Sequence, residues 1–303
     1  MRIGILGHKE FVVSRRDMLS SIASSGIEIA ADVEEIDWGE PAIIDEWLNQ
    51  KPEVLEKLDV LLISVPAAYM YTVTEQVLRN GLHAYLHWNT SISISEYQKL
   101  AELAEEAGSE LGIDLPLKYH PLFNRLPSRR STSVLSIQKA LATPSTHAFQ
   151  KAIEQSLELC YHYANKSEVQ RIDAQVVRSK PPIPDTLLAS IRFQNGTYIH
   201  IHIHQPASKS VHTVHASGTG FSIEVDLEQG TLKQTQQTEE EQDQENGYIQ
   251  TAFEVSSLPT VSLDEAALKA FIIAIAEEQP APVSIFDGLQ TKRIIEKLRK
   301  CLR

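Results

Sequence analysis

The sequence predicts an α/β protein with two domains: an N-terminal doubly wound parallel sheet and a C-terminal α+β domain with a large, mostly antiparallel sheet. The length of 303 residues exceeds what a single core usually holds. Short apolar runs alternate with helical patterns over residues 1–120. Over residues 121–303 the predicted strands follow one another through turns, which is typical of antiparallel pairing.

Short apolar runs predict the buried strands of the first domain. They cover residues 2–6, 27–31, 59–65 and 83–86, with a weaker run at 115–119. Helices are predicted between them at residues 14–24, 41–48, 72–79 and 95–107, the last with Ser95 as its N-cap. Ligands of such sheets bind beyond the carboxyl ends of the strands, so the residues there form the candidate site. They are Gly7, Asp32, Val65, Pro66, His87, Trp88, Tyr119 and His120.

The second domain is predicted to begin after residue 120 and to combine one long helix with a run of strands. The helix covers residues 146–164, and strands follow at 169–177, 186–193, 197–204, 210–216 and 221–226. Asn195-Gly196 is the strongest hairpin signal in the chain. The polar, acidic run at 234–246 predicts a solvated loop. We expect that amphipathic helices at 263–277 and 288–298 can pack back on the first domain.

Composition restricts the partners and the compartment. A net charge of −12 argues against nucleic acid or an anionic membrane, because both need clustered Lys and Arg. Two cysteines, Cys160 and Cys301, give no disulfide framework and no cysteine metal site, which fits a reducing cytoplasm. The N-terminus does not resemble a signal peptide, and no apolar run approaches roughly 18 residues. We therefore expect a cytoplasmic protein that binds a small molecule.

Several motifs occur in one order along the chain, and together they resemble a known family. They are Ile3-Gly4-Ile5-Leu6-Gly7, Val65-Pro66, Gly81 to Leu86, Phe193-Gln194-Asn195-Gly196 and Gly218-Thr219-Gly220. This order is similar to that of the glucose–fructose oxidoreductase / inositol dehydrogenase (Gfo/Idh/MocA) family. The resemblance implies a Rossmann dinucleotide-binding domain over residues 1–120 and a substrate and oligomerisation domain over 121–303.

The resemblance also implies a nicotinamide cofactor, NAD or NADP. It places Gly7, His8 and Lys9 at the phosphates and Asp32 on the adenosine ribose. It places Val65, Pro66 and Trp88 beside the nicotinamide. An acid at the ribose disfavours a 2′-phosphate, which gives a slight preference for NAD. Only the first glycine of the phosphate fingerprint is present, so we expect weak binding, with loss of the cofactor as the alternative.

The acid–base residues depart from the family pattern. Family members carry Glu-Lys-Pro where this chain has His87-Trp88-Asn89, and the lysine there handles the proton. Imidazole is a suitable replacement, although strand alternation points His87 to the opposite face from Trp88. The alternative is a histidine packed or hydrogen-bonded within the strand end. Tyr119, His120 and His147 are further catalytic candidates, with a surface role as the alternative for His147.

Three histidines alternate with isoleucines over residues 199–204. His200, His202 and His204 therefore share one face of a predicted strand. They could bind a metal ion, but residues two apart on a strand are about 6.6 Å apart, so one ion could bridge two of them and the third would need the sheet to bend. We expect no metal, and we expect this face to form a homo-oligomer interface, as the resemblance implies.

Three function hypotheses follow. The preferred one is a divergent NAD(P)-dependent oxidoreductase that transfers a hydride to or from a small molecule, with relocated acid–base groups. The second is a non-catalytic descendant that binds a ligand or partner. The third is a structural subunit that pairs with an active homologue.

Overall fold

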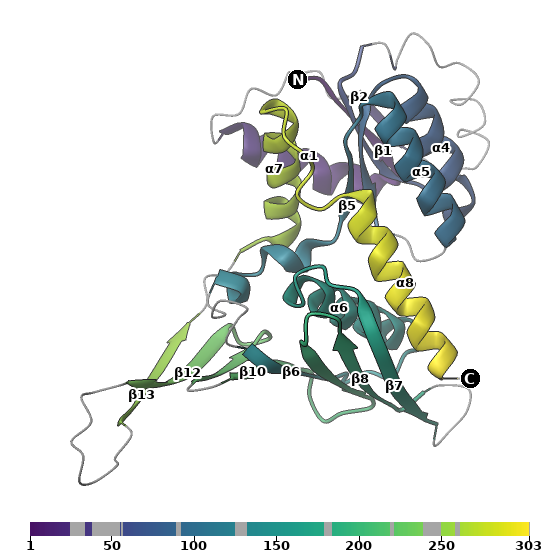
Figure 1. Cartoon of the computed structure of the whole chain (residues 1–303). Helices are drawn as coiled ribbons and strands as arrows, with labels where there is room; N and C mark the ends of the chain where they lie inside the picture. Colours follow the sequence, from purple (N-terminus) through teal and green to yellow (C-terminus); the bar gives the residue numbers. More distant parts are fainter. Residues whose placement is uncertain are drawn as a thin grey trace. The chain divides into compact units, whose positions relative to one another are not determined.

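Figure 1 shows the fold of the chain in a computed structural model. It describes residues 1–24, 34–37, 55, 57–88, 92–124, 132–178, 184–218, 221–238, 250–257 and 261–302. The chain divides into two compact units, Met1–Pro116 with Ser262–Arg293 and Leu117–Val261 with Ile294–Arg303. Residues 262–293 thus belong to the first unit, although the sequence-based limits count them with the second domain while allowing its helices to pack back.

The first unit contains a five-stranded parallel sheet, as predicted. Its strands are β1 (Ile3–Gly7), β2 (Glu34–Asp37), β3 (Val60–Ser64), β4 (His83–His87) and β5 (Leu111–Asp114). They lie in the order β2-β1-β3-β4-β5, so the chain changes direction across the sheet between β1 and β3. Such a switch point is where ligands bind in doubly wound folds.

Helices cover both faces of this sheet (Figure 1). Helices α1 (Lys9–Ser24) and α7 (Leu263–Ala276) bury their apolar sides against one face. That core includes Ile5, Leu62 and Tyr85 from the strands and Phe271 from α7. Helices α4 (Ala67–Arg79) and α5 (Ile94–Ala107) lie together on the other side.

Three expectations about the first unit need correction or fall outside the description. The strand predicted at 115–119 is wrong, because Pro116 lacks the amide that a sheet requires and opens a 3-10 helix, η1 (Pro116–Tyr119), which is followed by η2 (Pro121–Asn124). The N-cap of α5 is Ser93 and not Ser95, since Ser93 forms a capping box with Glu96. The segments predicted at 27–31 and 41–48 lie outside the described residues.

The second unit contains the predicted large sheet, with eight strands in the order β13-β12-β11-β10-β6-β9-β8-β7. All neighbours are antiparallel except β6 and β9. The strands are β6 (Thr132–Ala140), β7 (Val169–Val177), β8 (Thr186–Phe193), β9 (Tyr198–His204), β10 (Val211–Gly218), β11 (Phe221–Asp226), β12 (Thr231–Thr238) and β13 (Gln250–Ser257).

One face of this sheet packs on α6 (Thr146–Tyr163), which the sequence predicts almost to the residue. Ile199, Ile201 and Ile203 are buried on β9, whereas His200 is exposed, so the predicted alternation is confirmed. The last helix, α8 (Ile285–Cys301), contributes residues to both units.

Strands β6, β12 and β13 are missing from the sequence prediction. The loop predicted at 234–246 is wrong for residues 234–238, which belong to β12. Leu232 alone supplies a buried apolar side chain among the described positions of β12, so the strand has little hydrophobic pattern. Backbone pairing with β11 and β13 holds it in the sheet.

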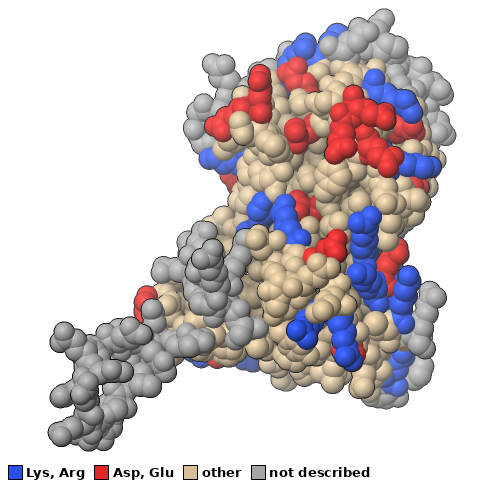
Figure 2. All heavy atoms as spheres, in the orientation of Figure 1, with Lys and Arg blue, Asp and Glu red and all other residues tan. Residues whose placement is uncertain are grey.

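Charge is unevenly distributed on the face shown in Figure 2. Acidic side chains gather over the upper helices of the first unit, and basic ones follow α8. No helix within the described residues is long and apolar enough to cross a membrane.

Candidate functional site

Polar side chains meet at the carboxyl edge of the parallel sheet in the first unit. Gly7 and Ser64 are register partners at the ends of β1 and β3. His87 and Asp114 are register partners at the ends of β4 and β5. This edge contains the switch point, so the structure places these residues where doubly wound sheets bind their ligands.

His87 and Asp114 form a hydrogen-bonded pair. The distance from His87 Nδ1 to Asp114 Oδ2 is 3.1 Å. The carboxyl is buried, with 4% of the Asp114 side chain exposed, whereas 53% of the His87 side chain is exposed. Among the described residues, Nε2 of His87 has no hydrogen-bond partner, so this nitrogen is left for an external group.

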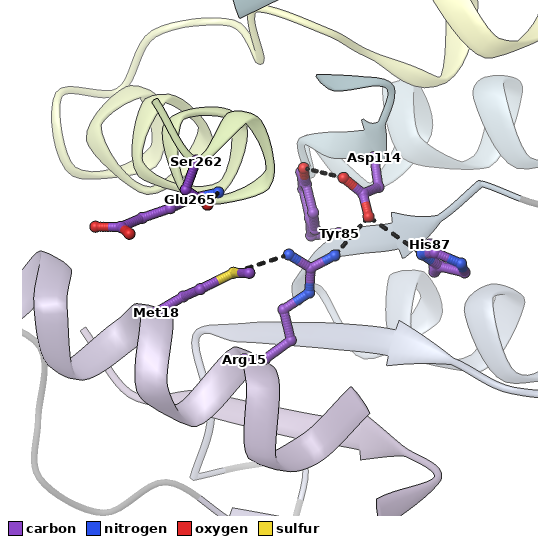
Figure 3. A network of polar contacts seen from close by, with 7 residues as sticks. All are labelled: Arg15, Met18, Tyr85, His87, Asp114, Ser262 and Glu265. Atoms are coloured by element: carbon purple, nitrogen blue, oxygen red, sulfur yellow. Dashed lines mark hydrogen bonds and ion pairs between the residues drawn. The ribbon is translucent and has the colours of Figure 1, made fainter. Parts of the chain in front are cut away.

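Two more side chains hold Asp114, as Figure 3 shows. Arg15 of α1 donates from Nη2 to Oδ2 at 2.5 Å, and the Tyr85 hydroxyl donates to Oδ1 at 3.2 Å. Arg15 also donates to the Met18 sulfur at 3.2 Å and is 3% exposed. Burial alone would raise the pKa of Asp114, but the hydrogen bond with His87 and the charge of Arg15 lower it below its ordinary value. The carboxyl is therefore ionised at neutral pH.

Phe11 of α1 fills the space between this pair and the β1–α1 turn. Its ring meets His87 edge-on, with centroids 6.0 Å apart, and stacks on His8 at 6.3 Å. The guanidinium of Arg15 lies 5.1 Å from the same ring. A Cβ atom at Gly7 would lie 2.5 Å from Phe11 Cδ1, so this glycine is needed for the close approach of the phenyl ring.

The other predicted cofactor residues lie at this edge where they are described. Lys9 is exposed at the start of α1, and Val12, in the place of the last fingerprint glycine, is buried in the core. Val65 is buried and Pro66 is the N-cap residue of α4. Asp32 lies outside the described residues.

Asp37 is an acidic strand end that the sequence prediction missed. It is the last residue of β2 and the register partner of Gly7. The acid that meets a ribose in Rossmann folds follows the second strand. The signal was the acidic run Glu34-Glu35-Ile36-Asp37, which the sequence prediction did not assign to a strand.

Trp88 lies on the opposite face from His87, as strand alternation predicts. Its ring is 5.8 Å from that of Tyr97 on α5. A Cβ atom at Gly288 would lie 3.1 Å from Trp88 Cζ3, so the indole also packs closely on α8. Contact between Trp88 and a cofactor stays a prediction.

The remaining catalytic candidates belong to the second unit. Tyr119 ends η1 and His120 follows it, so neither lies at a strand end. His120 is half-buried, and burial lowers its pKa. His147 is exposed in the first turn of α6. Their catalytic roles stay predictions.

The histidine face of β9 borders a groove of about 670 Å³. His200 Nδ1 lies 3.0 Å from Ser190 Oγ, and the rings of His202 and His204 are 5.2 Å apart. No group of three possible metal ligands occurs among the residues that the structure describes. The expected oligomer interface on this face stays a prediction.

Arg15 and Asp114 are two further site residues that sequence reasoning missed. Asp114 ends the run Leu111-Gly112-Ile113-Asp114, but the fifth strand was predicted four residues later. With β5 placed correctly, its last residue would have been recognised as a strand-end carboxylate beside His87. Nothing in the sequence marks Arg15 as different from other helix arginines.

Comparisons with known proteins identify the fold. No protein-family model and no curated protein matches the chain. UDP-N-acetylglucosamine 3-dehydrogenase GnnA from Acidithiobacillus ferrooxidans has a TM-score of 0.77 at 17% identity, covering 100% of this chain and 97% of that chain. A dehydrogenase, MviM, from Clostridium difficile has a TM-score of 0.75 at 13% identity, covering 100% and 99%.

A third solved structure of this fold contains a cofactor. An oxidoreductase from Agrobacterium radiobacter in complex with NAD⁺, L-tartaric acid and magnesium has a TM-score of 0.74 at 14% identity. The match covers 99% of this chain and 96% of that one. The chain therefore has the two-domain α/β fold of NAD-binding oxidoreductases, and at these identities the likeness concerns the fold alone.

Proposed function

We propose that this chain is a nicotinamide-dependent oxidoreductase of small molecules in which His87 transfers the proton that accompanies hydride transfer. The observation that carries the proposal is the hydrogen bond between exposed His87 and buried, ionised Asp114 at the ligand edge of the sheet. A lysine at the position of Trp88 is then not needed.

The pair is arranged for acid–base chemistry. Asp114 accepts a hydrogen bond from Nδ1–H, which fixes the imidazole tautomer in which Nε2 is the base. During oxidation, Nε2 would take the hydroxyl proton of the substrate, and Asp114 would stabilise the imidazolium. During reduction, the same nitrogen returns the proton to the new alkoxide. Arg15 and Tyr85 keep the carboxylate in place.

The residues at the sheet edge fit a dinucleotide, although not through the usual glycine loop. When bound, the nicotinamide accepts or supplies the hydride. Lys9 and the backbone amides at the start of α1 would meet the phosphates. Asp37 would meet the ribose, and Val65 and Pro66 would border the nicotinamide. Because a lysine replaces a glycine at the phosphates, we expect the dinucleotide to bind weakly. Because an acid at the ribose disfavours a 2′-phosphate, we expect NAD to be preferred to NADP.

Titration of the protein with NADH and NADPH, followed by fluorescence or calorimetry, tests the cofactor. We expect saturation at micromolar or weaker affinity. Asp37→Ala should weaken NADH binding, and Asp32→Ala is the matched variant that tests the acid predicted from the sequence. Absence of binding at millimolar concentrations of both cofactors would contradict the proposal.

A substrate screen tests the chemistry. Sugar nucleotides and hydroxy acids, chosen because GnnA acts on a UDP-sugar and the Agrobacterium protein was solved with tartaric acid, would be mixed with NAD⁺ and followed by NADH absorbance. His87→Asn should lower turnover by about 10² to 10⁴ while cofactor binding is retained. Turnover that is unchanged in His87→Asn would exclude this histidine as the acid–base group.

One observation favours a non-catalytic descendant as the second candidate. Phe11 packs against Gly7 at the β1–α1 turn, where a dinucleotide would approach the backbone. In that case a ligand or partner binds, but no substrate in the screen is oxidised. Phe11→Ala separates the two candidates, because opening this space should strengthen cofactor binding only if a dinucleotide enters it.

We also propose that the chain forms a homo-oligomer through the outer face of its large sheet. Leu188 is 47% exposed there, and His200 and His202 border the same groove. Light scattering after size exclusion would give the mass, and Leu188→Arg should release the monomer.

A further inference from the structure

Lys139 on β6 is a buried lysine that has no acidic partner among the residues that the structure describes. Only 8% of the residue is exposed, and its Nζ donates to Gln155 Oε1 of α6 at 2.5 Å. Among the described residues, no carboxylate lies within ion-pair distance of Nζ. A buried ammonium normally has a counter-ion, because removing it from water is costly.

His212 on β10 is the direct neighbour of Lys139 across the sheet. The two are register partners, and both side chains point to the buried face. His212 is 8% exposed, and its Nε2 is buried without a hydrogen-bond partner in the described structure. Burial, and then the charges of Lys139 and His120, lower the pKa of His212 to about 3, so this imidazole is neutral. A neutral imidazole can present an N–H to a ligand.

The surroundings contain more cationic than anionic groups. Burial lowers the pKa of Lys139 to about 8, Glu228 in the turn between β11 and β12 opposes this effect, and Lys151 of α6 adds to it. Even so, a pKa of about 8 leaves most of the lysine charged at neutral pH. Glu228, the acid that raises the pKa of Lys139, is exposed and does not form an ion pair with the ammonium in the described structure.

We propose that Lys139 and His212 form a binding site for a compact oxyanion, a carboxylate or phosphate group, on the inner face of the large sheet. The ammonium would supply the charge, the imidazole would donate a second hydrogen bond, and Gln155 would hold the lysine in position. This site goes beyond the proposed function, and the residues that make it all belong to the second unit.

A purely structural role is the competing explanation. In that case the bond to Gln155 is all that Lys139 requires, and anions have no effect on it. The two explanations differ in whether an oxyanion stabilises the protein and raises the pKa of this lysine, as an opposite charge must.

The test uses the 303-residue chain without cofactor and two probes, sodium phosphate and sodium acetate, at an ionic strength held constant with sodium chloride. Thermal unfolding is recorded against probe concentration, and the lysine ¹³Cε signals are followed by NMR. We expect a saturable rise in Tm and a shift of one lysine signal, which is absent in Lys139→Met. The probe with the tighter binding tells whether the group is a phosphate or a carboxylate.

Substitutions test whether the probes bind at Lys139 and His212. Lys139→Met and His212→Gln should each weaken probe binding at least tenfold. Lys151→Met, an exposed lysine on the same helix as Gln155, should change it less than threefold. If Lys139→Met does not fold, probe binding to His212→Gln is the measurement that decides. No saturable response in the wild type, or a response that persists in the variants, overturns the proposal.

The outcome is independent of the oxidoreductase proposal. Anion binding is measured in the second unit without cofactor, whereas NADH binding and hydride transfer test the sheet edge of the first unit. Anion binding without NADH binding would leave this site standing while the proposed reaction fails.

Discussion

The two proposed sites, one in each unit, differ in how their buried charged group is paired. In the first unit, Asp114 receives hydrogen bonds from Arg15, His87 and Tyr85. In the described part of the second unit, Lys139 has one neutral partner, Gln155, and Nε2 of its neighbour His212 has no hydrogen-bond partner.

This difference indicates that the first cluster holds a side chain in position, whereas the second binds a ligand. The Asp114 carboxylate is held by three donors and fixes the groups around it, which leaves Nε2 of the exposed His87 available to a ligand. The Lys139 ammonium lacks an opposite charge and the His212 imidazole lacks a hydrogen-bond partner in the described structure, and a bound anion would supply both. The proposed proton transfer therefore belongs to the first cluster and the proposed oxyanion binding to the second, each within its own unit.

The largest expected effect follows from Asp114→Asn. The substitution leaves the Arg15 guanidinium buried without its counter-ion, and loss of one partner of a buried pair typically costs about 3–5 kcal/mol. Urea unfolding measures the loss. The control is Glu75→Gln, which breaks an exposed pair with Arg79 and should cost about 0–1 kcal/mol. Similar losses in both variants would show that the Asp114 network is not tightly coupled.

Arg15→Met should change the pH dependence of stability. The folded pKa of Asp114 lies below its ordinary value of about 4, so the ionised carboxyl stabilises the fold above that pH. This stabilisation is lost as the pH falls through the folded pKa. Removal of Arg15 raises that pKa, and the loss should begin at a higher pH. Acid titration of the unfolding free energy, with Arg79→Met as the exposed control, tests this; identical profiles for Arg15→Met and wild type would contradict it.

The smallest expected change in the free energy of unfolding is that of Lys139→Met. Lys139→Met removes an unpaired buried charge and keeps the volume of the side chain, so without anions the unfolding free energy should change by less than about 1 kcal/mol or rise. Urea unfolding in chloride measures it. A loss of several kcal/mol would mean that Lys139 is satisfied within the protein, which would weaken the contrast between the clusters.

Local patterns predicted much of the fold. The alternation of isoleucine and histidine gave the two faces of β9, and Asn195-Gly196 gave the turn between β8 and β9, where Gly196 has a φ of 86°. Pro116 shows the limit, because an apolar run around a proline was taken for a strand. Strand β12 shows another, since its polar sequence is held by backbone pairing to its neighbours.

The candidate site was predicted only in part. His87 was recognised from its place at a strand end, but its partner Asp114 depends on the register between β4 and β5, which the sequence does not state. Lys139 looks like any polar strand residue, because its burial comes from β10 and α6, which are distant in sequence. Both clusters thus depend on tertiary neighbours.

The most direct test of the acid–base assignment is ¹⁵N NMR of the histidine rings with and without NAD⁺, with His87→Asn to assign the signals. The account predicts that neutral His87 carries its proton on Nδ1 and that its Nε2 signal moves when NAD⁺ is added. A proton on Nε2, or signals that NAD⁺ leaves unchanged while it binds, would contradict it.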